Sequence, residues 1–144
     1  MTANTAATSG LVRQRAPAPS MRENVVGAVE AYLNGLAAKD MSAAPFHPNI
    51  EFQGPIGPCL IGAATIRACF SGFFPIVEGV RIIRHIVDGG WCATLFDFQT
   101  TLGNLPMVHC CQVVDGQIIS IRAYYDPRPV VDSGLYFPHL ISGQ

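Results

Sequence analysis

The stretch WCATLFDFQTTLGNLPMVHCCQVVDGQIISIRAYYD, residues 91–126, decides the fold. Its apolar and polar residues alternate, as is typical of strands, and two glycine-containing dipeptides interrupt the alternation. The pattern predicts, in order, a strand over 91–102, a hairpin tip at Gly103-Asn104, a strand over 105–114, a turn at Asp115-Gly116 and a strand over 117–125. One more alternating segment, residues 80–87, comes before them. The sequence therefore predicts a four-stranded antiparallel meander.

Helices are predicted upstream of this meander. The capping box Ser20–Glu23 opens a helix whose apolar residues recur every three or four positions up to about Ala38. Residues 62–70 predict another helix, 42–46 a short helix and 50–53 a short strand. Helices followed by an antiparallel meander indicate an α+β fold, in which the helices pack on one face of a conical curved sheet and leave a cavity.

Composition limits the possible partners. The 144 residues suit one domain, and 9 Lys+Arg against 10 Asp+Glu argue against nucleic acid, which needs a basic surface. The longest charge-free run, residues 98–114, is too short and too polar to span a membrane. Because only 13% of the residues are charged, we expect uncovered apolar surface. This predicts a homodimer that buries part of the outer face of the sheet.

The cysteines and the two ends of the chain predict its setting. Five cysteines without a C-x-x-C pair support neither a zinc site nor a disulfide framework, so we expect reduced thiols and a cytoplasmic protein. The first twenty residues show no signal-peptide pattern. Residues 1–19 predict a disordered arm, 20–129 the folded domain, and 130–144 an apolar tail that packs on the domain or on a partner subunit.

Asp97 is the first candidate for chemistry. It is the only charge in its predicted strand, and alternation places it on one face with Leu95 and Gln99. A carboxylate among such neighbours loses water, which raises its pKa and suits a general base or acid. The alternative is an outward-facing Asp97 that pairs with Arg81 or Arg84.

His109 and Tyr32 are the next candidates. With the predicted hairpin tip, residues 107–111 are expected opposite 97–99, which brings His109 within reach of Asp97. An imidazole held by a carboxylate can shuttle protons or polarise a carbonyl, and the phenol of Tyr32 can donate to an enolate oxygen. The alternatives are a hydrogen-bonded core histidine and an ordinary core tyrosine.

Five more side chains are expected to contact substrate. Gln53 offers an amide to a carbonyl, although it could equally face solvent, and Tyr125 has the parity to face inward. The candidates for the pocket wall are Phe52, Trp91 and Leu95. The sequence contains no metal-ligand set, phosphate-binding loop or nucleophile elbow, so it predicts a site without a cofactor.

Five segments occur in a fixed order along most of the chain: Tyr32–Asp40 (YLNGLAAKD), Ile50–Pro55 (IEFQGP), Gly62–Ile66 (GAATI), Val114–Ile118 (VDGQI) and Ile121–Asp126 (IRAYYD). Together they resemble the nuclear transport factor 2-like (NTF2-like) superfamily, above all its ketosteroid isomerase-like and SnoaL-like polyketide cyclase branch. The resemblance implies a cystatin-like α+β barrel with a conical pocket, and an isomerase or lyase activity.

The resemblance also implies roles for single positions. Tyr32 falls where the steroid isomerases keep an oxyanion-hole tyrosine, and His109 where they keep a second donor. Their general-base aspartate falls at Gly54, so this chain lacks that base. Relatives that hydrolyse limonene epoxide keep acids at positions that match Asp97 and Ala123, and of these only Asp97 is acidic here.

The resulting hypothesis is a cofactor-independent isomerase, cyclase or dehydratase acting by proton transfer on a small apolar carbonyl metabolite, such as a polyketide, terpenoid or steroid-like compound. Asp97 is the expected base, with His109 as its partner, while Tyr32 and Gln53 hold the oxyanion. Two alternatives stay open. One is a non-catalytic small-molecule-binding or interaction module, and the other is an epoxide hydrolase with a water molecule held by Asp97.

Overall fold

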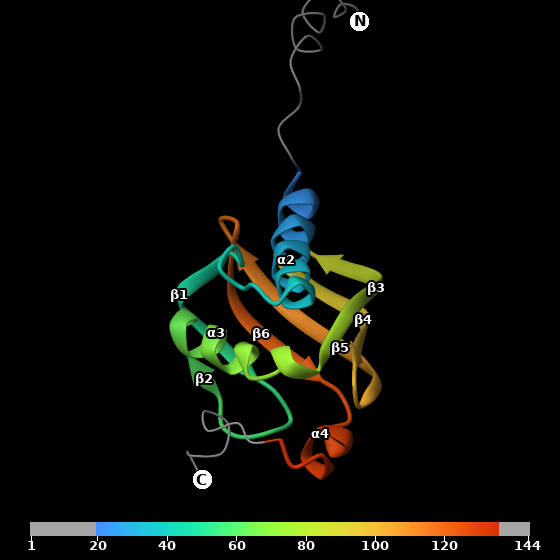
Figure 1. Cartoon of the computed structure of the whole chain (residues 1–144). Coiled ribbons are helices and arrows are strands. Elements are labelled where there is room, and N and C mark those ends of the chain that lie inside the picture. The colour runs from blue at the N-terminus through green and yellow to red at the C-terminus, as the bar shows by residue number, and fades with distance from the viewer. Residues whose placement is uncertain (1–19, 136–144) are drawn as a thin grey trace, which may run out of the picture.

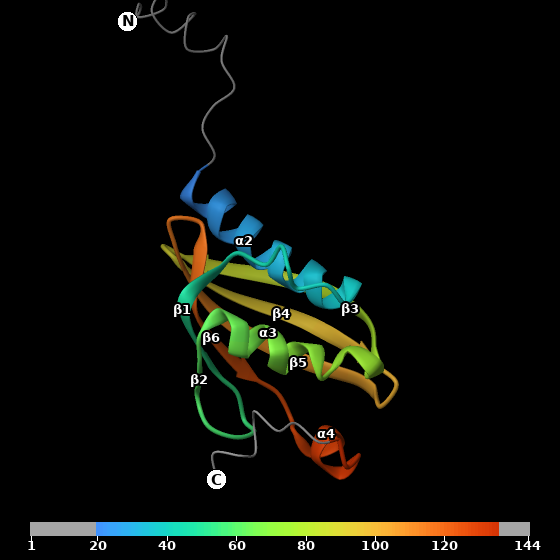
Figure 2. The same cartoon turned by 60° about the vertical axis from the view of Figure 1, so that its left-hand side comes forward.

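Helices α2 and α3 cover one face of a curved sheet, which confirms the predicted α+β fold (Figure 1 and Figure 2). The computed structural model describes residues 20–135. Its helical elements are α2 (Met21–Ala38), α3 (Ala63–Ser71), the short 3-10 helix η1 (Phe74–Ile76) and α4 (Arg128–Asp132). Its strands are β1 (Phe46–Gln53), β2 (Leu60–Ile61), β3 (Val77–Asp88), β4 (Trp91–Thr100), β5 (Gly103–Val114) and β6 (Gln117–Tyr124).

The strands form one sheet in the order β2-β1-β6-β5-β4-β3. Strands β3 to β6 are the predicted antiparallel meander. β1 extends the sheet on the other side of β6 by pairing with it in parallel, with Phe52 opposite Ile121. The sheet curls around the helices, so that its inner face and the helices enclose the core (Figure 2).

The sequence of α2 explains its position on this inner face. The N–H of Glu23 donates to Ser20 Oγ at 3.1 Å and the N–H of Ser20 donates to Glu23 Oε1 at 2.9 Å, so the predicted capping box is confirmed. The apolar face of the helix is buried: Val25, Ala28, Val29, Tyr32, Leu33 and Leu36. On its side, Glu30 Oε2 lies 3.0 Å from His85 Nε2 on β3 and ties the helix to the sheet.

Residues 42–46 do not form the predicted short helix. The carboxylate of Asp40 accepts hydrogen bonds from both the N–H and the hydroxyl of Ser42, at 3.0 and 2.7 Å, and this side-chain bonding favours a turn over a helix. β1 then begins at Phe46, whose side chain is buried, instead of at Ile50 as predicted. The strand is therefore four residues longer at its start.

The hairpin between β4 and β5 turns two residues earlier than predicted. Thr100 pairs with Gly103, so the tip is Thr101-Leu102 and not Gly103-Asn104. The hydroxyl of Thr100 donates to the carbonyl of Gly103 at 2.8 Å and accepts from the N–H of Leu102 at 3.1 Å, which fixes the turn. Gly103, with φ of 109°, opens the returning strand in a conformation that favours glycine.

Within residues 20–135, no helix combines the length and the apolar character that crossing a bilayer requires. The predicted arm, residues 1–19, lies outside the described residues, as does most of the predicted tail, 136–144. The described start of that tail begins inside α4, where Val130 is buried.

Candidate functional site

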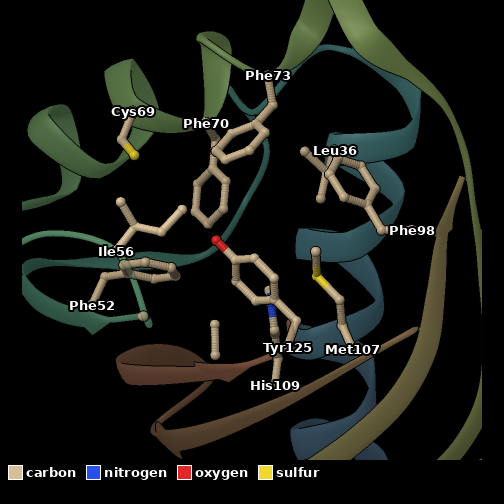
Figure 3. A pocket seen from close by; sticks show the side chains of 12 residues that line it. Leu36, Phe52, Ile56, Cys69, Phe70, Phe73, Phe98, Met107, His109 and Tyr125 are labelled. Carbon is tan, nitrogen blue, oxygen red and sulfur yellow. The ribbon is translucent and has the colours of Figure 1, made fainter. Parts of the chain in front are cut away.

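An apolar pocket lies between α3, the end of α2 and the inner face of the sheet (Figure 3). Two polar side chains interrupt a wall that is otherwise aromatic, aliphatic or sulfur-containing: Leu36, Phe52, Gly54, Ile56, Cys69, Phe70, Phe73, Phe98, Met107, His109, Ala123 and Tyr125. The free volume is about 30 Å³, room for about two water molecules. The protein's own side chains therefore fill most of the predicted cone.

His109 is one of the two polar wall residues, and it is bonded to Tyr32. Its Nδ1 lies 2.9 Å from the Tyr32 hydroxyl, and the two rings stack at 18° with centroids 5.9 Å apart. β5 directs His109 inward, and α2 places Tyr32 above it. Phe96 meets the imidazole edge-on at 4.8 Å. Among residues 20–135, the other ring nitrogen of His109, Nε2, has no hydrogen-bond partner.

Burial keeps the polar groups of the pocket uncharged. It lowers the pKa of His109 to about 3, so the imidazole is neutral near pH 7. It raises the pKa of the Tyr32 phenol well above its usual value, and that of Tyr125 to about 12. No lining side chain among the described residues is an Asp, Glu, Lys or Arg. The pocket therefore offers neutral hydrogen-bonding groups and apolar surface.

Tyr125 and Phe52 complete the polar and aromatic part of the wall. Tyr125 directly follows β6, and its hydroxyl points toward Phe70 and Phe52 (Figure 3). Phe52 comes from β1 and meets the ring of Phe70 edge-on at 5.3 Å. Of the residues predicted from sequence, the structure brings together Tyr32, His109, Phe52 and Tyr125.

Asp97 lies outside this pocket, so the expected pairing with His109 is wrong. Its carboxylate forms an ion pair with Arg81 on the neighbouring strand β3, which is the alternative that the sequence left open. The Asp97 side chain is 10% exposed and its Arg81 partner is 65% exposed. Hydrogen bonds from Asn104 first, and then from Arg81, lower the pKa of Asp97 instead of raising it as expected.

The alternation of the sheet explains the error. Residues that pair directly share a face, and Asp97 pairs with Pro106 while His109 pairs with Thr94. His109 is therefore in phase with Met107, which lines the pocket, and Asp97 points to the outer face. The earlier hairpin turn also places His109 further along the sheet from Asp97 than predicted.

Three predicted substrate contacts lie on the outer face as well. Gln53 is exposed there, and its Nε2 donates to the carbonyl of Gly54 at 3.1 Å. Leu95 is in phase with Asp97 and is half-buried, and Trp91, at the start of β4, is 44% exposed. Leu95 shares the face of Asp97, as alternation predicts, but this face is the outer one, and strand parity likewise turns Gln53 and Trp91 away from the pocket.

Several wall residues were missed, and parity could have found two of them. Met107 precedes His109 by two positions and Ala123 precedes Tyr125 by two, so each shares the inner face of its strand. Ile56 lies in the loop after β1, where no periodic pattern exists to identify it.

Two wall positions are those at which the resembling enzymes keep an acid. Gly54, which matches the general base of steroid isomerases, lines the pocket without a side chain. A Cβ added there would lie 3.3 Å from the ring of Phe52, so the site is already crowded. Ala123, which matches an acid of the epoxide hydrolases, contributes only a methyl group. The pocket thus lacks both carboxylates.

A family profile described as a domain of unknown function (DUF4904) matches residues 21–144. No curated protein matches the sequence. An NTF2-like protein of unknown function from Cytophaga hutchinsonii superimposes with a TM-score of 0.66 at 18% identity, over 81% of this chain and 99% of the other.

Two similar structures are described as enzymes. A steroid delta-isomerase from Pseudomonas aeruginosa matches with a TM-score of 0.61 at 19% identity, over 72% of this chain and 80% of the other. A protein described as a SnoaL-like polyketide cyclase, from Jannaschia sp. CCS1, matches with a TM-score of 0.63 at 14% identity, over 81% and 95%. At these identities the likeness shows the fold, which is NTF2-like.

Proposed function

We propose, for a chain that belongs to the DUF4904 family and has the NTF2-like fold, that the pocket binds a small, largely apolar carbonyl compound and holds its oxygen against His109. One observation carries the proposal: a buried, neutral imidazole whose Nε2 has no partner among residues 20–135 lines a cavity whose other polar side chain is Tyr125. An unpaired buried polar group costs about 1–3 kcal/mol, and a ligand oxygen that pairs with Nε2 recovers part of this cost.

The wall also suits the rest of such a ligand. Its aromatic and aliphatic side chains, with Met107 and Cys69, form an apolar surface. Each Å² of apolar ligand surface buried against it stabilises the complex by about 25 cal/mol. The free volume of about 30 Å³ is smaller than a ring-containing ligand, so binding widens the pocket. Ile56 and Tyr125 are half-buried, and they are the lining side chains with most freedom to move outward.

A catalytic role is the second candidate, in the isomerase, cyclase or dehydratase class. The observation in its favour is a pair of neutral donors, the imidazole of His109 and the hydroxyl of Tyr125, in one apolar cavity. Such donors stabilise an enolate oxygen more than the parent carbonyl. Because no carboxylate lines the described pocket, the base is solvent or a group on the substrate. Epoxide hydrolysis through Asp97 gains no support, because Asp97 points to the outer face.

Titration with 1-indanone, a compact bicyclic ketone, tests the first proposal. We expect His109→Leu to weaken binding about fivefold, since a neutral hydrogen bond contributes about 1 kcal/mol. Asp97→Asn is the matched control on the outer face and should bind like the wild type. Equal loss in both variants, or none in His109→Leu, contradicts the proposal.

Deuterium exchange separates binding from catalysis. In heavy water, a site that stabilises the enolate accelerates exchange of the hydrogens next to the carbonyl of bound 1-indanone. Binding without acceleration over buffer identifies a binding module, and acceleration that His109→Leu removes identifies an enzyme.

A further inference from the structure

We propose that His109 donates its Nε2–H to the ligand, that Tyr32 is a positioning residue that fixes this tautomer, and that the pocket therefore selects carbonyl compounds over the matching alcohols. The selectivity rests on the proposed function. The tautomer does not, because it follows from contacts within the protein.

The first step is the orientation of the Tyr32 hydroxyl. Tyr32 is fully buried, and among residues 20–135 the only hydrogen-bond partner of its hydroxyl is His109 Nδ1. The rings of Phe46 and Phe70, each 5.5 Å from the Tyr32 ring, offer no acceptor on the other sides. The phenol proton is therefore satisfied only if Tyr32 donates to Nδ1.

The second step compares the two possible proton arrangements. If Nδ1–H donated to Tyr32, the phenol proton would be left unpaired among aromatic rings, and Nε2 would also lack a partner. If Tyr32 donates to Nδ1, the one unpaired donor is Nε2–H, which belongs to a ring that lines the cavity. Because unpaired buried donors are rare and costly, the second arrangement is favoured. His109 thus carries its proton on Nε2, on a ring that lines the cavity.

The third step concerns what this donor selects. The Tyr125 hydroxyl lines the same cavity, and it too has no hydrogen-bond partner among the described residues. A carbonyl oxygen has two lone pairs and no proton, so it can accept from both groups. An alcohol brings a proton of its own, and no carboxylate or amide side chain among the lining residues accepts it. The alcohol therefore leaves either its own proton or that of Tyr125 unpaired.

The neutral charge state of His109 keeps the preference for carbonyl compounds constant near neutral pH. Burial lowers the pKa of His109 to about 3, so the ring carries one proton, at Nε2, under ordinary conditions. A carboxylate-bearing ligand would meet no cation, because no Lys or Arg side chain lines the pocket within the described residues.

Two measurements on the full chain test the inference. The ring nitrogen shifts of His109 in ¹⁵N-labelled protein should show the Nε2–H tautomer in the wild type and a mixture in Tyr32→Phe. Titrations with 1-indanone and 1-indanol, which share one skeleton, should favour the ketone by about tenfold in the wild type and less in Tyr32→Phe. Tyr124→Phe, an exposed tyrosine on the outer face, is the matched control and should behave like the wild type in both.

The outcomes separate the two proposals. A wild-type spectrum of the Nδ1–H tautomer, or equal affinity for ketone and alcohol, overturns the inference and leaves the pocket as a binding site. Binding of neither compound overturns the proposed function and the selectivity, whereas the spectrum still decides the tautomer. A Tyr32→Phe protein that keeps both the spectrum and the preference shows that Tyr32 does not set the tautomer.

Discussion

A double-mutant cycle on Tyr32 and His109 examines the central bond of the pocket. Tyr32→Phe removes one hydroxyl and keeps the ring contacts to Phe46 and Phe70 at 5.5 Å, so the main loss is the 2.9 Å bond to Nδ1. The buried Nδ1 is then unpaired, which costs about 1–3 kcal/mol. His109→Leu leaves the phenol proton unpaired at a similar cost. The double variant replaces both partners by apolar groups and leaves neither unpaired.

The free energy of unfolding should therefore not be additive. Each single variant should lose about 1–3 kcal/mol, and the double variant should lose less than the sum by at least about 1 kcal/mol. Urea unfolding followed by far-ultraviolet circular dichroism measures these values, and the single tryptophan, Trp91, gives an independent fluorescence signal. Tyr124→Phe on the outer face should change stability by less than about 0.5 kcal/mol. Additive losses within error would refute the bond as the link between the two residues.

Two further predictions concern pH and assembly. Burial lowers the pKa of His109 to about 3, so below about pH 6.5 the unfolded chain takes up a proton that the folded chain does not. The free energy of unfolding should therefore fall from about pH 7 to pH 4.5, and it should fall less steeply in His109→Leu. Urea unfolding measures it, and an equal fall in the wild type and in His109→Leu would contradict the prediction. We also propose that the outer face, where Ile86 and Trp91 are 54% and 44% exposed, joins two copies of the chain. Light scattering should show that the wild type is a dimer. Ile86→Lys should dissociate this dimer, whereas Val131→Lys, on α4, should leave it intact. A wild-type monomer at micromolar concentration would disprove the proposed dimer.

The order of the helices and strands was predictable because burial of one face of each element sets the spacing of its apolar residues. The meander and α2 follow from alternation and from helical spacing over an extended length. The position of the hairpin tip did not follow, because Gly103-Asn104 is the stronger turn signal by composition. Side-chain bonds of Thr100 hold the turn at Thr101-Leu102 instead, and residue type alone does not reveal such bonds.

Of the predicted site residues, Tyr32, His109, Phe52 and Tyr125 come together, whereas those on the outer face do not. Alternation correctly groups Asp97 with Leu95 and Gln99 on one face of β4, but alternation alone does not say which face of the sheet the helices cover. The expected Asp97–His109 contact fails because the register of β4 against β5 pairs odd with even positions, so Asp97 faces outward and His109 inward. The ion pair of Asp97 with Arg81 depends on the register of β3 against β4. The Tyr32–His109 bond joins a helix to a strand, and no local pattern encodes such a contact.

The parallel pairing of β1 with β6 gives this domain a particular order of assembly. Phe52, one wall of the pocket, lies opposite Ile121, which the ribosome adds much later. Until β6 has been synthesised, β1 lacks its pairing partner on that side. Closure of so distant a contact is slow, and a chain truncated before residue 117 would lack β6 and with it the strand that pairs with β1 at Phe52. The pocket wall at Phe52 is therefore completed last, when β1 meets β6.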